Sequence, residues 1–280
     1  MKSKKYQSYL KKSHKFKFIK LDKSGYKATI TINRESKLNC LNLETIQELI
    51  IAFKDCAWDD NIAVVVLTGA GKRAFSTGAD VKEQGDYFIN NPNDYYKWMY
   101  EFIELHQVMK DLGKPTIARL NGIVVGGGNE LNMSCDLAIA ADHIIIKQVG
   151  ARMGSVPAAG ATQFLPLIVG DRRAREIIML CEDIPAKKAL EWGLVNKVVP
   201  YAELDKEVDV MAEKLYNKLP ECLRYAKQQL NVWRDFSWHM TIGHARDWLA
   251  IHNLSNEVKE GINSFNNKKK VNYKKIRSGK

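Results

Sequence analysis

Apolar and polar residues along this chain follow two different periods, and the change of period predicts where strands and helices lie. Phe16–Leu21 and Lys27–Asn33 alternate or run apolar on either side of a Lys-Ser-Gly turn, which predicts a β-hairpin. Apolar residues then recur at helical spacing over Leu43–Trp58, after Asn42, which can cap the helix. The short β-branched run Ala63–Thr68 predicts a strand buried on both faces.

The same pattern continues to about residue 200 and then changes character. The further predicted elements are a helix at Tyr96–Leu112, strands at Pro115–Leu120, Leu137–Ala141 and Ile144–Gln148, a loop and helix at Ser155–Gly170, helices at Arg172–Cys181 and Ala186–Trp192, and a strand at Leu194–Val199. Gly71–Asp80 and Gly85–Trp98 show no clear period and are expected to be loops. From Ala202 onward only helices are expected. The chain therefore predicts an α/β core followed by a helical region.

Composition and charge narrow the class of protein. The chain has 280 residues, of which 45% are apolar and 27% charged, as in a soluble globular protein. It has no apolar run of about 18 residues, so no membrane span is expected. The net charge of +11 gathers largely in Lys2–Lys20 and Lys268–Lys280, which are interpreted first as solvated tails. A polyphosphate-bearing ligand such as a coenzyme A thioester is the favoured functional alternative, and nucleic acid is the weaker one because aromatic residues do not alternate with the basic ones.

The cysteines and histidines predict no metal site. Five cysteines are scattered through the chain without a CxxC or Cys/His ligand spacing. Reduced, buried thiols and a cytoplasmic location are therefore expected, with no metal and no separate cofactor. Cys135 precedes Asp136 with no base nearby in the sequence, so a nucleophilic thiol is not expected there. His244 and His252 lie about two helical turns apart and are expected to be structural.

The glycine-rich stretch from Gly126 to Glu130 is the clearest candidate for chemistry. Consecutive glycines at Gly126, Gly127 and Gly128 allow a ligand to approach the main chain between a strand and a helix. The free N–H groups and the positive end of that helix can bind an anion. Glu130 can then move a proton beside that anion. The alternative is a plain strand-to-helix turn in which Glu130 only favours the helix N-terminus.

Several motifs stand in one order over nearly the whole chain. They are Ile32-Asn33-Arg34, Leu38-Asn39-Cys40-Leu41-Asn42, Ala74-Phe75-Ser76-Thr77-Gly78-Ala79-Asp80, Asn121-Gly122, Gly126-Gly127-Gly128-Asn129-Glu130, Cys135-Asp136-Leu137-Ala138-Ile139-Ala140, the run from Gly154 to Gln163, and Gly193-Leu194-Val195. The series resembles the crotonase (enoyl-CoA hydratase/isomerase) superfamily. The resemblance implies an α/β fold with a spiral of ββα units, a helical C-terminal trimerisation region, and assembly as a homotrimer or dimer of trimers.

The resemblance also divides the chain. It implies a basic N-terminal tail at 1–15, a spiral core with the acyl-CoA site at 16–201, a helical oligomerisation region at 202–265 and a basic C-terminal tail at 266–280.

By motif position, the family's two oxyanion-binding N–H groups belong to Ala79 and Gly127. Fixed donors aimed at developing charge supply several kcal/mol of catalysis in such sites. Glu130 occupies the place of the first of two catalytic glutamates in the family's hydratases. The place of the second glutamate is taken by Gly150, which argues against simple fatty enoyl-CoA hydration and is expected to leave room for a bulkier acyl group or a water.

Gly150 and its neighbours resemble a branch of the superfamily that acts on cyclic or β-keto acyl-CoAs. This branch includes dihydroxynaphthoyl-CoA synthase and 6-oxocyclohex-1-ene-1-carbonyl-CoA hydrolase. The chain has Pro157 where some members carry an aspartate, and it lacks a long insertion of the ring hydrolase. The expected reaction is hydration of a cyclic enoyl-CoA with possible hydrolytic ring opening. The alternatives are an ordinary hydratase or double-bond isomerase with Glu130 alone, and an RNA-binding or scaffolding homologue.

The remaining candidates are assigned by their place near these motifs. Substrate-binding candidates are Gly78, Asp80, Gly126, Gly150, Arg152, Ser155 and Tyr87, and candidates for the coenzyme A phosphates are Lys82 and Lys268. Asp80 is expected to hold its loop by backbone hydrogen bonds rather than to transfer protons. A tyrosine of the Gly85–Trp98 stretch is a candidate donor to a substrate carbonyl, or else this stretch packs on a neighbouring subunit.

Overall fold

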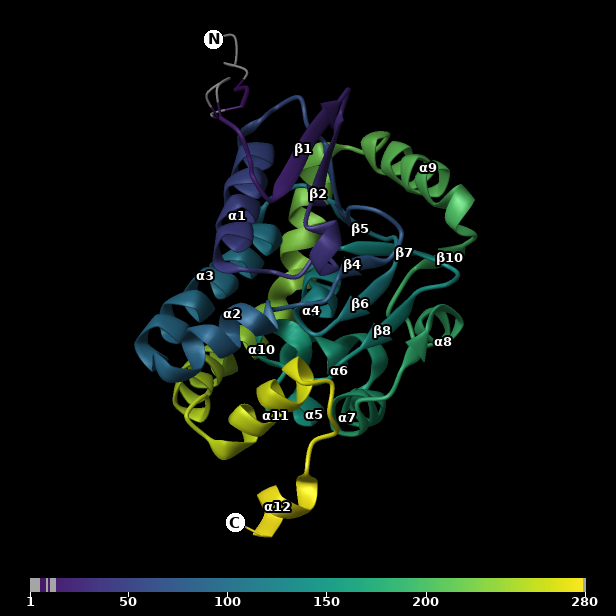
Figure 1. Cartoon of the computed structure of the whole chain (residues 1–280). Coiled ribbons are helices and arrows are strands. Elements are labelled where there is room, and N and C mark those ends of the chain that lie inside the picture. The colour runs from purple at the N-terminus through teal and green to yellow at the C-terminus, as the bar shows by residue number, and fades with distance from the viewer. Residues whose placement is uncertain (1–5, 9, 11–13, 279–280) are drawn as a thin grey trace.

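The fold begins with the predicted hairpin and extends it into a mixed sheet. A computed structural model describes residues 6–8, 10 and 14–278 (Figure 1). Strands β1 (Ile19–Ser24) and β2 (Lys27–Ile32) pair antiparallel, and β2 pairs in parallel with β3 (Val64–Gly69). The order continues through β5 (Thr116–Leu120) and β7 (Leu137–Ala141) to β10 (Lys197–Val199). All six residues of β3 are buried, as its β-branched sequence predicts for a central parallel strand.

A second, smaller sheet repeats the order of the first one. Its strands are β4 (Ala74–Ser76), β6 (Ile123–Val125), β8 (Ile145–Lys147) and β9 (Ile184–Pro185). From β3 to β8, the chain adds one strand to the large sheet and the next to the small sheet, so that β3–β4, β5–β6 and β7–β8 are successive pairs. Helices follow each pair, which confirms the predicted ββα spiral.

The helices pack around these sheets, and most lie where the apolar period predicted them. The helices before residue 200 are α1 (Leu43–Trp58), α2 (Val81–Asp86), α3 (Pro92–Asp111), α4 (Gly127–Ser134), α5 (Gly150–Met153), α6 (Gln163–Val169), α7 (Asp171–Leu180) and α8 (Ala186–Glu191). The short turn η1 (Glu35–Lys37) precedes α1, and η2 (Phe88–Asn90) and η3 (Ala158–Thr162) lie between later helices. The side chain of Asn42 accepts a hydrogen bond from the Thr45 amide, which confirms the predicted cap of α1.

Two predicted loops contain regular structure. The Gly71–Asp80 stretch includes β4, and the Gly85–Trp98 stretch is formed by the end of α2, by η2 and by the start of α3. Asp80 caps α2 by accepting from the amides of Lys82 and Glu83. Pro92 begins α3, because its fixed φ and missing N–H suit the first turn of a helix. The prediction of a long loop here was therefore wrong.

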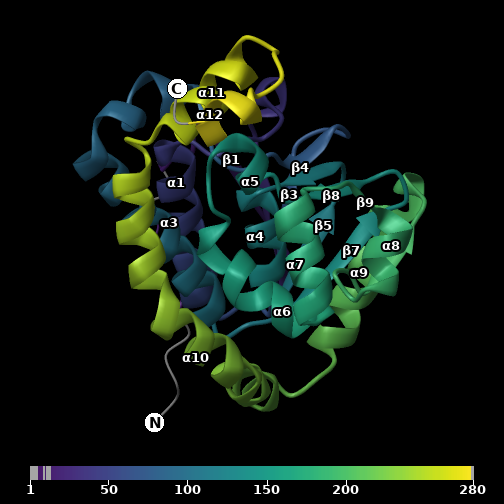
Figure 2. The same ribbon diagram turned by 90° about the horizontal axis from the view of Figure 1, so that it is seen from below.

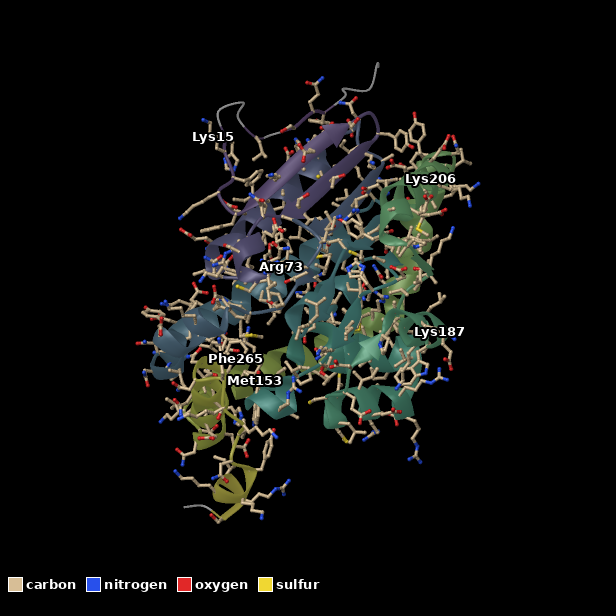
Figure 3. All side chains as sticks on the ribbon, turned by 45° about the vertical axis from the view of Figure 1, so that its right-hand side comes forward. Lys15, Arg73, Met153, Lys187, Lys206 and Phe265 are labelled. Atoms are coloured by element: carbon tan, nitrogen blue, oxygen red, sulfur yellow. The ribbon has the colours of Figure 1, made fainter. Side chains whose placement is uncertain are left out.

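The C-terminal region contains helices and turns only, within the residues that the structure describes. These are η4 (Tyr201–Glu203), α9 (Leu204–Tyr216), α10 (Pro220–His252), α11 (Asn256–Asn266) and α12 (Tyr273–Ser278). Figure 2 shows α10 running along α3 and α6, while α11 returns to α2 and α5. A Cβ at Gly261 would lie 2.0 Å from the Met153 carbonyl oxygen, so glycine allows α11 to approach α5 closely. Met153 and Phe265 mark this junction in Figure 3.

The ends of the chain make contacts with the core where they are described. The Tyr6 amide donates to the Asp60 carboxylate over 2.6 Å, and the Tyr6 ring lies 5.3 Å from that of Trp58. At the other end, the Asn272 amide donates to the Glu260 carboxylate over 3.1 Å. Residues 1–5, 9, 11–13 and 279–280 of the predicted tails lie outside the described residues. No helix among those described has the length and apolar character needed to cross a membrane.

Candidate active site

Two backbone segments that are far apart in the sequence meet at Gly78 and Gly127. The Leu41 amide donates to the Gly78 carbonyl over 2.8 Å, and the Asp80 amide donates to the Leu41 carbonyl over 3.0 Å. This parallel bridge uses the groups on either side of Ala79, so the Ala79 N–H faces away from Leu41. A Cβ at Gly78 would lie only 2.7 Å from the Gly127 nitrogen. The Ala79 and Gly127 amides are therefore near neighbours.

Both of these amides are free to bind a ligand. Among the described residues, neither the Ala79 nor the Gly127 N–H has an acceptor, and both residues are partly exposed. Gly127 is the first residue of α4, where helix geometry leaves the N–H groups without intrahelical partners. The partial positive charge at this end of the helix adds to the attraction for an anion. The predicted pair of anion-binding donors thus comes together in the structure.

Glycine is required at positions 126 and 128 of this turn for different structural reasons. Gly126 has φ 54° and ψ −118°, a conformation that side chains disfavour, although a Cβ there would meet nothing within 4 Å. Gly128 has the opposite constraint, since its Cβ would lie 2.2 Å from the Ser76 carbonyl oxygen. Close contact between α4 and β4 therefore requires glycine at position 128, whereas backbone conformation requires it at 126.

Glu130 lies in the first turn of α4, directly after these glycines, and is only 5% exposed. Burial raises the pKa of its carboxyl group from 4.5 to about 8. None of the described hydrogen bonds or ion pairs involves its carboxyl oxygens. At neutral pH the group therefore holds its proton in most free molecules, and it can give or take a proton within the physiological range.

One face of α3 carries four ring side chains that run toward this turn, and we call Tyr95, Trp98, Phe102 and His106 the α3 stripe. Their successive ring centroids are 5.9, 5.2 and 4.5 Å apart. The Phe102 Cζ atom lies 3.1 Å from the place that a Gly127 Cβ would take. Burial raises the pKa of the Tyr95 hydroxyl, and the nearby Glu130 carboxylate raises it further. The stripe thus faces α4 and forms the wall opposite the anion-binding turn.

A polar cleft of about 320 Å³ opens beside the same turn and is lined by Arg34, Lys37, Asn42, Asp80, Lys82, Glu83 and Asp86. Arg34 forms an ion pair with Asp80 over 2.9 Å, and both side chains are largely buried. The hydrogen bonds from this pair, together with the α2 cap, hold the Asp80 pKa below its usual range against the effect of burial. Asp80 holds its loop, as predicted. Lys82 is exposed at the cleft, where a phosphate can reach it.

Tyr87 and Gly150 have surroundings other than expected, whereas Lys268 is accessible. The Tyr87 ring is half exposed, and its hydroxyl donates to Asp94 over 2.7 Å rather than facing Glu130. A Cβ at Gly150 would lie 2.8 Å from the Ser155 carbonyl oxygen and 2.9 Å from Pro157 Cδ, so the expected extra room is filled by that segment. Lys268 is exposed in the turn after α11.

Arg152 and Ser155 lie in and after α5, close in sequence to Gly150. Both residues are exposed, and the Ser155 amide donates to the Gly150 carbonyl over 2.9 Å. This bond closes the short α5 turn, so the backbone amide of Ser155 helps to hold the main chain around Gly150. Met153, between them, is the residue on which α11 packs.

The sequence pattern of the enoyl-CoA hydratase/isomerase family matches residues 24–276. The chain belongs to this family. It is 28% identical to 6-oxocyclohex-1-ene-1-carbonyl-CoA hydrolase of Geobacter metallireducens, over 91% of this chain and 81% of that protein. Among solved structures, it is similar to an enoyl-CoA hydratase of Bacillus anthracis, with 32% identity, a TM-score of 0.75 and coverage of 92% and 99%. An enoyl-CoA hydratase of Mycobacterium avium subsp. paratuberculosis has 25% identity, a TM-score of 0.84 and the same coverage.

Membership of the enoyl-CoA hydratase/isomerase family confirms the predicted resemblance and makes this an acyl-CoA enzyme. The sequence did not single out Trp98, which is buried on α3, or Gln84, a half-buried residue of α2 whose amide nitrogen is buried. The spacing of Tyr95, Trp98 and Phe102 after Pro92 is a helical period that could have revealed the stripe. The same helical period places Tyr95 on the buried face of α3 and the adjacent Tyr96 on its exposed face.

The cysteines agree with their predicted inert role, with one exception. Cys40, Cys56, Cys135 and Cys181 are buried, whereas Cys222 is exposed, contrary to the expectation of burial. Burial raises the pKa of the Cys135 thiol to about 12, which opposes its use as a nucleophile. All five cysteines are free.

Proposed function

We propose that this family member adds water to the double bond of a cyclic enoyl-CoA and can then open the ring hydrolytically. The observation that carries the proposal is the pair of free amides at Ala79 and Gly127 beside the buried carboxyl group of Glu130. The similarity to a ring hydrolase supports a cyclic acyl group. Coenzyme A enters as part of the substrate, and no separate cofactor is needed for these steps.

In the hydration step, the two amides bind the thioester oxygen, which gains negative charge as water attacks. Ionised Glu130 takes a proton from the water while its oxygen bonds to the β-carbon. The double-bond electrons move to the thioester oxygen and form an enolate. The proton then passes from Glu130 to the α-carbon. One carboxyl group serves as base and then as acid, which accounts for a family member with glycine at position 150.

Ring opening uses the same enolate site. Where a ring ketone lies β to the thioester, hydroxide generated by Glu130 adds to the ketone carbon. The bond between that carbon and the α-carbon then breaks, and its electron pair forms the thioester enolate held by Ala79 and Gly127. Protonation of the α-carbon completes the reaction, and the former ketone becomes a carboxylate. Each round of cleavage consumes one further water.

Mass spectrometry of the products from linear and cyclic enoyl-CoAs tests the proposal. We expect cyclic enoyl-CoAs to gain one water, and cyclic enoyl-CoAs that also carry a ring ketone β to the thioester to gain two. Glu130→Gln should reduce turnover by at least about 1,000-fold without loss of fold, since it removes the proton carrier. For the wild type, kcat/KM should rise with pH up to about 8, as the carboxyl group ionises. Linear crotonyl-CoA as the best substrate would instead indicate an ordinary hydratase.

The surface of α10 supports assembly into a homotrimer or dimer of trimers. Four large apolar side chains at helical spacing are exposed along it, namely Leu230, Trp233, Phe236 and Met240, and each is at least 66% exposed. Such a stripe is typical of a subunit interface. Light scattering after size exclusion measures the mass, and Trp233→Glu should lower it to that of a monomer. An unchanged mass would place the interface elsewhere.

Two further parts of the proposal concern the ligand's charged end and the location of the enzyme. Lys82 is proposed to bind coenzyme A phosphates at the polar cleft, with Arg34 and Lys37 adding positive potential there. Lys268 stays a second candidate for the same role. The free state of all five cysteines supports the proposed cytoplasmic location.

A further inference from the structure

We propose that Gln84, Tyr95 and Trp98 form a receptor for an oxygen atom on the acyl group, remote from the thioester. The inference rests on the proposed function and deepens it, because it states what kind of acyl group the site selects. We call these three residues the acyl-oxygen receptor. It would make the enzyme selective for ketone-bearing acyl groups over hydrocarbon ones of the same shape.

The position of the receptor follows from the α3 stripe. At one point of the stripe, Phe102 lies against Gly127, whose amide is one of the two anion-binding donors. At its other end, Tyr95 lies close enough to Glu130 for the carboxylate to shift the pKa of its hydroxyl. Trp98 lies between them, with its ring 5.9 Å from that of Tyr95 and only 7° from parallel to it. The receptor therefore lies on the wall that an acyl group bound at Gly127 and Glu130 must face.

Two hydrogen-bond donors of the receptor have no partner. The Trp98 indole Nε1 and the Gln84 amide Nε2 are buried, and neither donates to any acceptor among the described residues. A buried donor left unpaired costs about 1–3 kcal/mol, so native proteins rarely keep one without a use. Gln84 also lies beside the Tyr95 hydroxyl, where its contact opposes the rise of the Tyr95 pKa. Gln84 and Trp98 thus both neighbour Tyr95 on one largely apolar wall.

The neighbouring histidine of the stripe does not supply the missing acceptor. His106 Nδ1 donates to the Phe102 carbonyl over 2.7 Å, which leaves Nε2 as an acceptor that bonds to neither donor. The His106 ring stacks on Trp238, with 5.8 Å between the ring centroids. Burial lowers the pKa of His106 to about 4, so the ring stays neutral. The donors of Trp98 and Gln84 therefore have no acceptor among the described residues and are available to a ligand oxygen.

The chemistry of the receptor defines its ligand. Tryptophan offers only a donor, and the free atom of Gln84 is its donor nitrogen. A ketone oxygen is the best match, because it accepts two hydrogen bonds and brings no donor of its own. An acyl group without that oxygen leaves both donors unpaired, and sites built to hydrogen-bond a substrate strongly reject analogues that lack the partner.

The helix that carries Gln84 is held in place by the end of the chain. A Cβ at Gly85 would lie 2.7 Å from Ile262 Cγ2, so α11 packs directly beside Gln84. The receptor is therefore assembled from side chains on α2 and α3 that are fixed by α11. Such support is required for a hydrogen-bonding site to keep its geometry.

Binding of ligands that cannot react tests the receptor apart from the proposed chemistry. We would measure by calorimetry the Kd of cyclohexanecarbonyl-CoA and of its 3-oxo and 4-oxo derivatives, which lack the double bond and carry no ketone β to the thioester. The wild type should bind one of the oxo ligands at least about 10-fold more tightly than the hydrocarbon ring. No preference for either oxo ligand would overturn the proposal.

Trp98→Phe removes the indole donor and keeps an aromatic ring. It should reduce the preference for the oxo ligand about 10-fold and change the Kd of cyclohexanecarbonyl-CoA less than about 3-fold. Gln84→Met should act in the same direction if Trp98→Phe disturbs packing. Tyr100→Phe is the matched control, since Tyr100 is exposed on the same helix. Equal loss of affinity for both ligands would mean a structural role and would overturn the proposal.

The two proposals fail in different ways. A preference for the oxo ligand without any gain of water in the product assay would retain the receptor and refute the proposed reaction. Hydration of cyclic enoyl-CoAs with no effect of Trp98→Phe on the oxo preference would retain the reaction and refute the receptor.

Discussion

Glu130 lies between a surface formed by backbone atoms and a surface formed by side chains. On one side lie backbone atoms of Gly78, Ala79 and Gly127, packed so closely that a single added Cβ would touch them. On the other side lie the side chains of Tyr95 and Trp98, which a mutation can change without moving the main chain. The backbone around the anion site is therefore fixed by the fold, whereas the side chains of the acyl wall can be substituted without moving the main chain.

The largest effect is expected from the addition of one carbon atom on the backbone side. Gly128→Ala would place Cβ 2.2 Å from the Ser76 carbonyl, so α4 must move away from β4. We expect a loss of about 3 kcal/mol or more in the free energy of unfolding, and turnover below about 1% of wild type. Chemical denaturation and steady-state kinetics measure both.

The matched control for this change is two residues earlier. Gly126→Ala meets no atom within 4 Å and suffers only from the positive φ, so its cost should be roughly 1–3 kcal/mol. Equal stability of the two variants would contradict the claim that contact with Ser76, rather than glycine itself, sets the position of α4.

Glu130→Gln tests whether Glu130 is buried between the two surfaces, because burial makes the stability of the fold depend on pH. The pKa of Glu130 is raised from 4.5 to about 8 in the folded chain, so the folded state binds this proton more tightly than the unfolded state does. That stabilisation is complete below about pH 4.5 and is lost as the pH rises through 8. The variant should therefore melt roughly 5 °C or more above the wild type at pH 9, with a smaller difference at pH 5. Parallel curves of Tm against pH would show that Glu130 is not buried as described.

On the side-chain wall, combined substitutions are expected to have a smaller effect, on ligand affinity rather than on stability. Trp98→Phe and Gln84→Met together should cost less in oxo-ligand affinity than the sum of the two single changes, because both donors serve one oxygen. A coupling free energy of about 0.5–1.5 kcal/mol is expected from the four Kd values. Strict additivity would mean that the two donors bind separate atoms. Melting temperatures should stay within a few degrees of wild type.

The smallest expected effect lies at the polar cleft, outside both sides. Lys82→Ala removes one exposed positive charge and should raise KM about 2–5-fold at low salt. The difference should shrink at high ionic strength, since exposed charges are screened. kcat should not change, because the lysine does not touch the reacting atoms. A fall in kcat with constant KM would contradict the proposed phosphate contact.

The sequence predicted the backbone side better than the wall, and the reason is physical. The bounds of α1 (Leu43–Trp58) agree with the prediction, because a strong apolar period and the Asn42 cap both mark them. The roles proposed for Gly127 and Glu130 rest on a local sequence motif. The strands β4 and β6 have three residues each, too few to show an alternating pattern, and they were missed.

The wall depends on contacts between segments that are distant in the sequence. Tyr87 and Tyr95 are equivalent as sequence letters in one aromatic stretch, and only the start of α3 at Pro92 puts Tyr95 inside and leaves Tyr87 outside. Likewise, the space beside Gly150 is filled by Pro157, which the sequence places several residues away in a segment without a clear period. A local sequence pattern does not show which distant residue packs against Gly150.

The packing of α11 on α2 and α5 has a consequence for the order in which the enzyme is completed during synthesis. The anion-binding turn is contained in the chain up to Glu130, and its contacts with β4 are already available at that point. The support for Gln84 comes from Ile262, which is made more than a hundred residues later. A growing chain would therefore possess the means to hold an enolate before it possesses the means to choose an acyl group. In the proposed scheme, selectivity for the acyl group would thus be completed after the anion-binding turn.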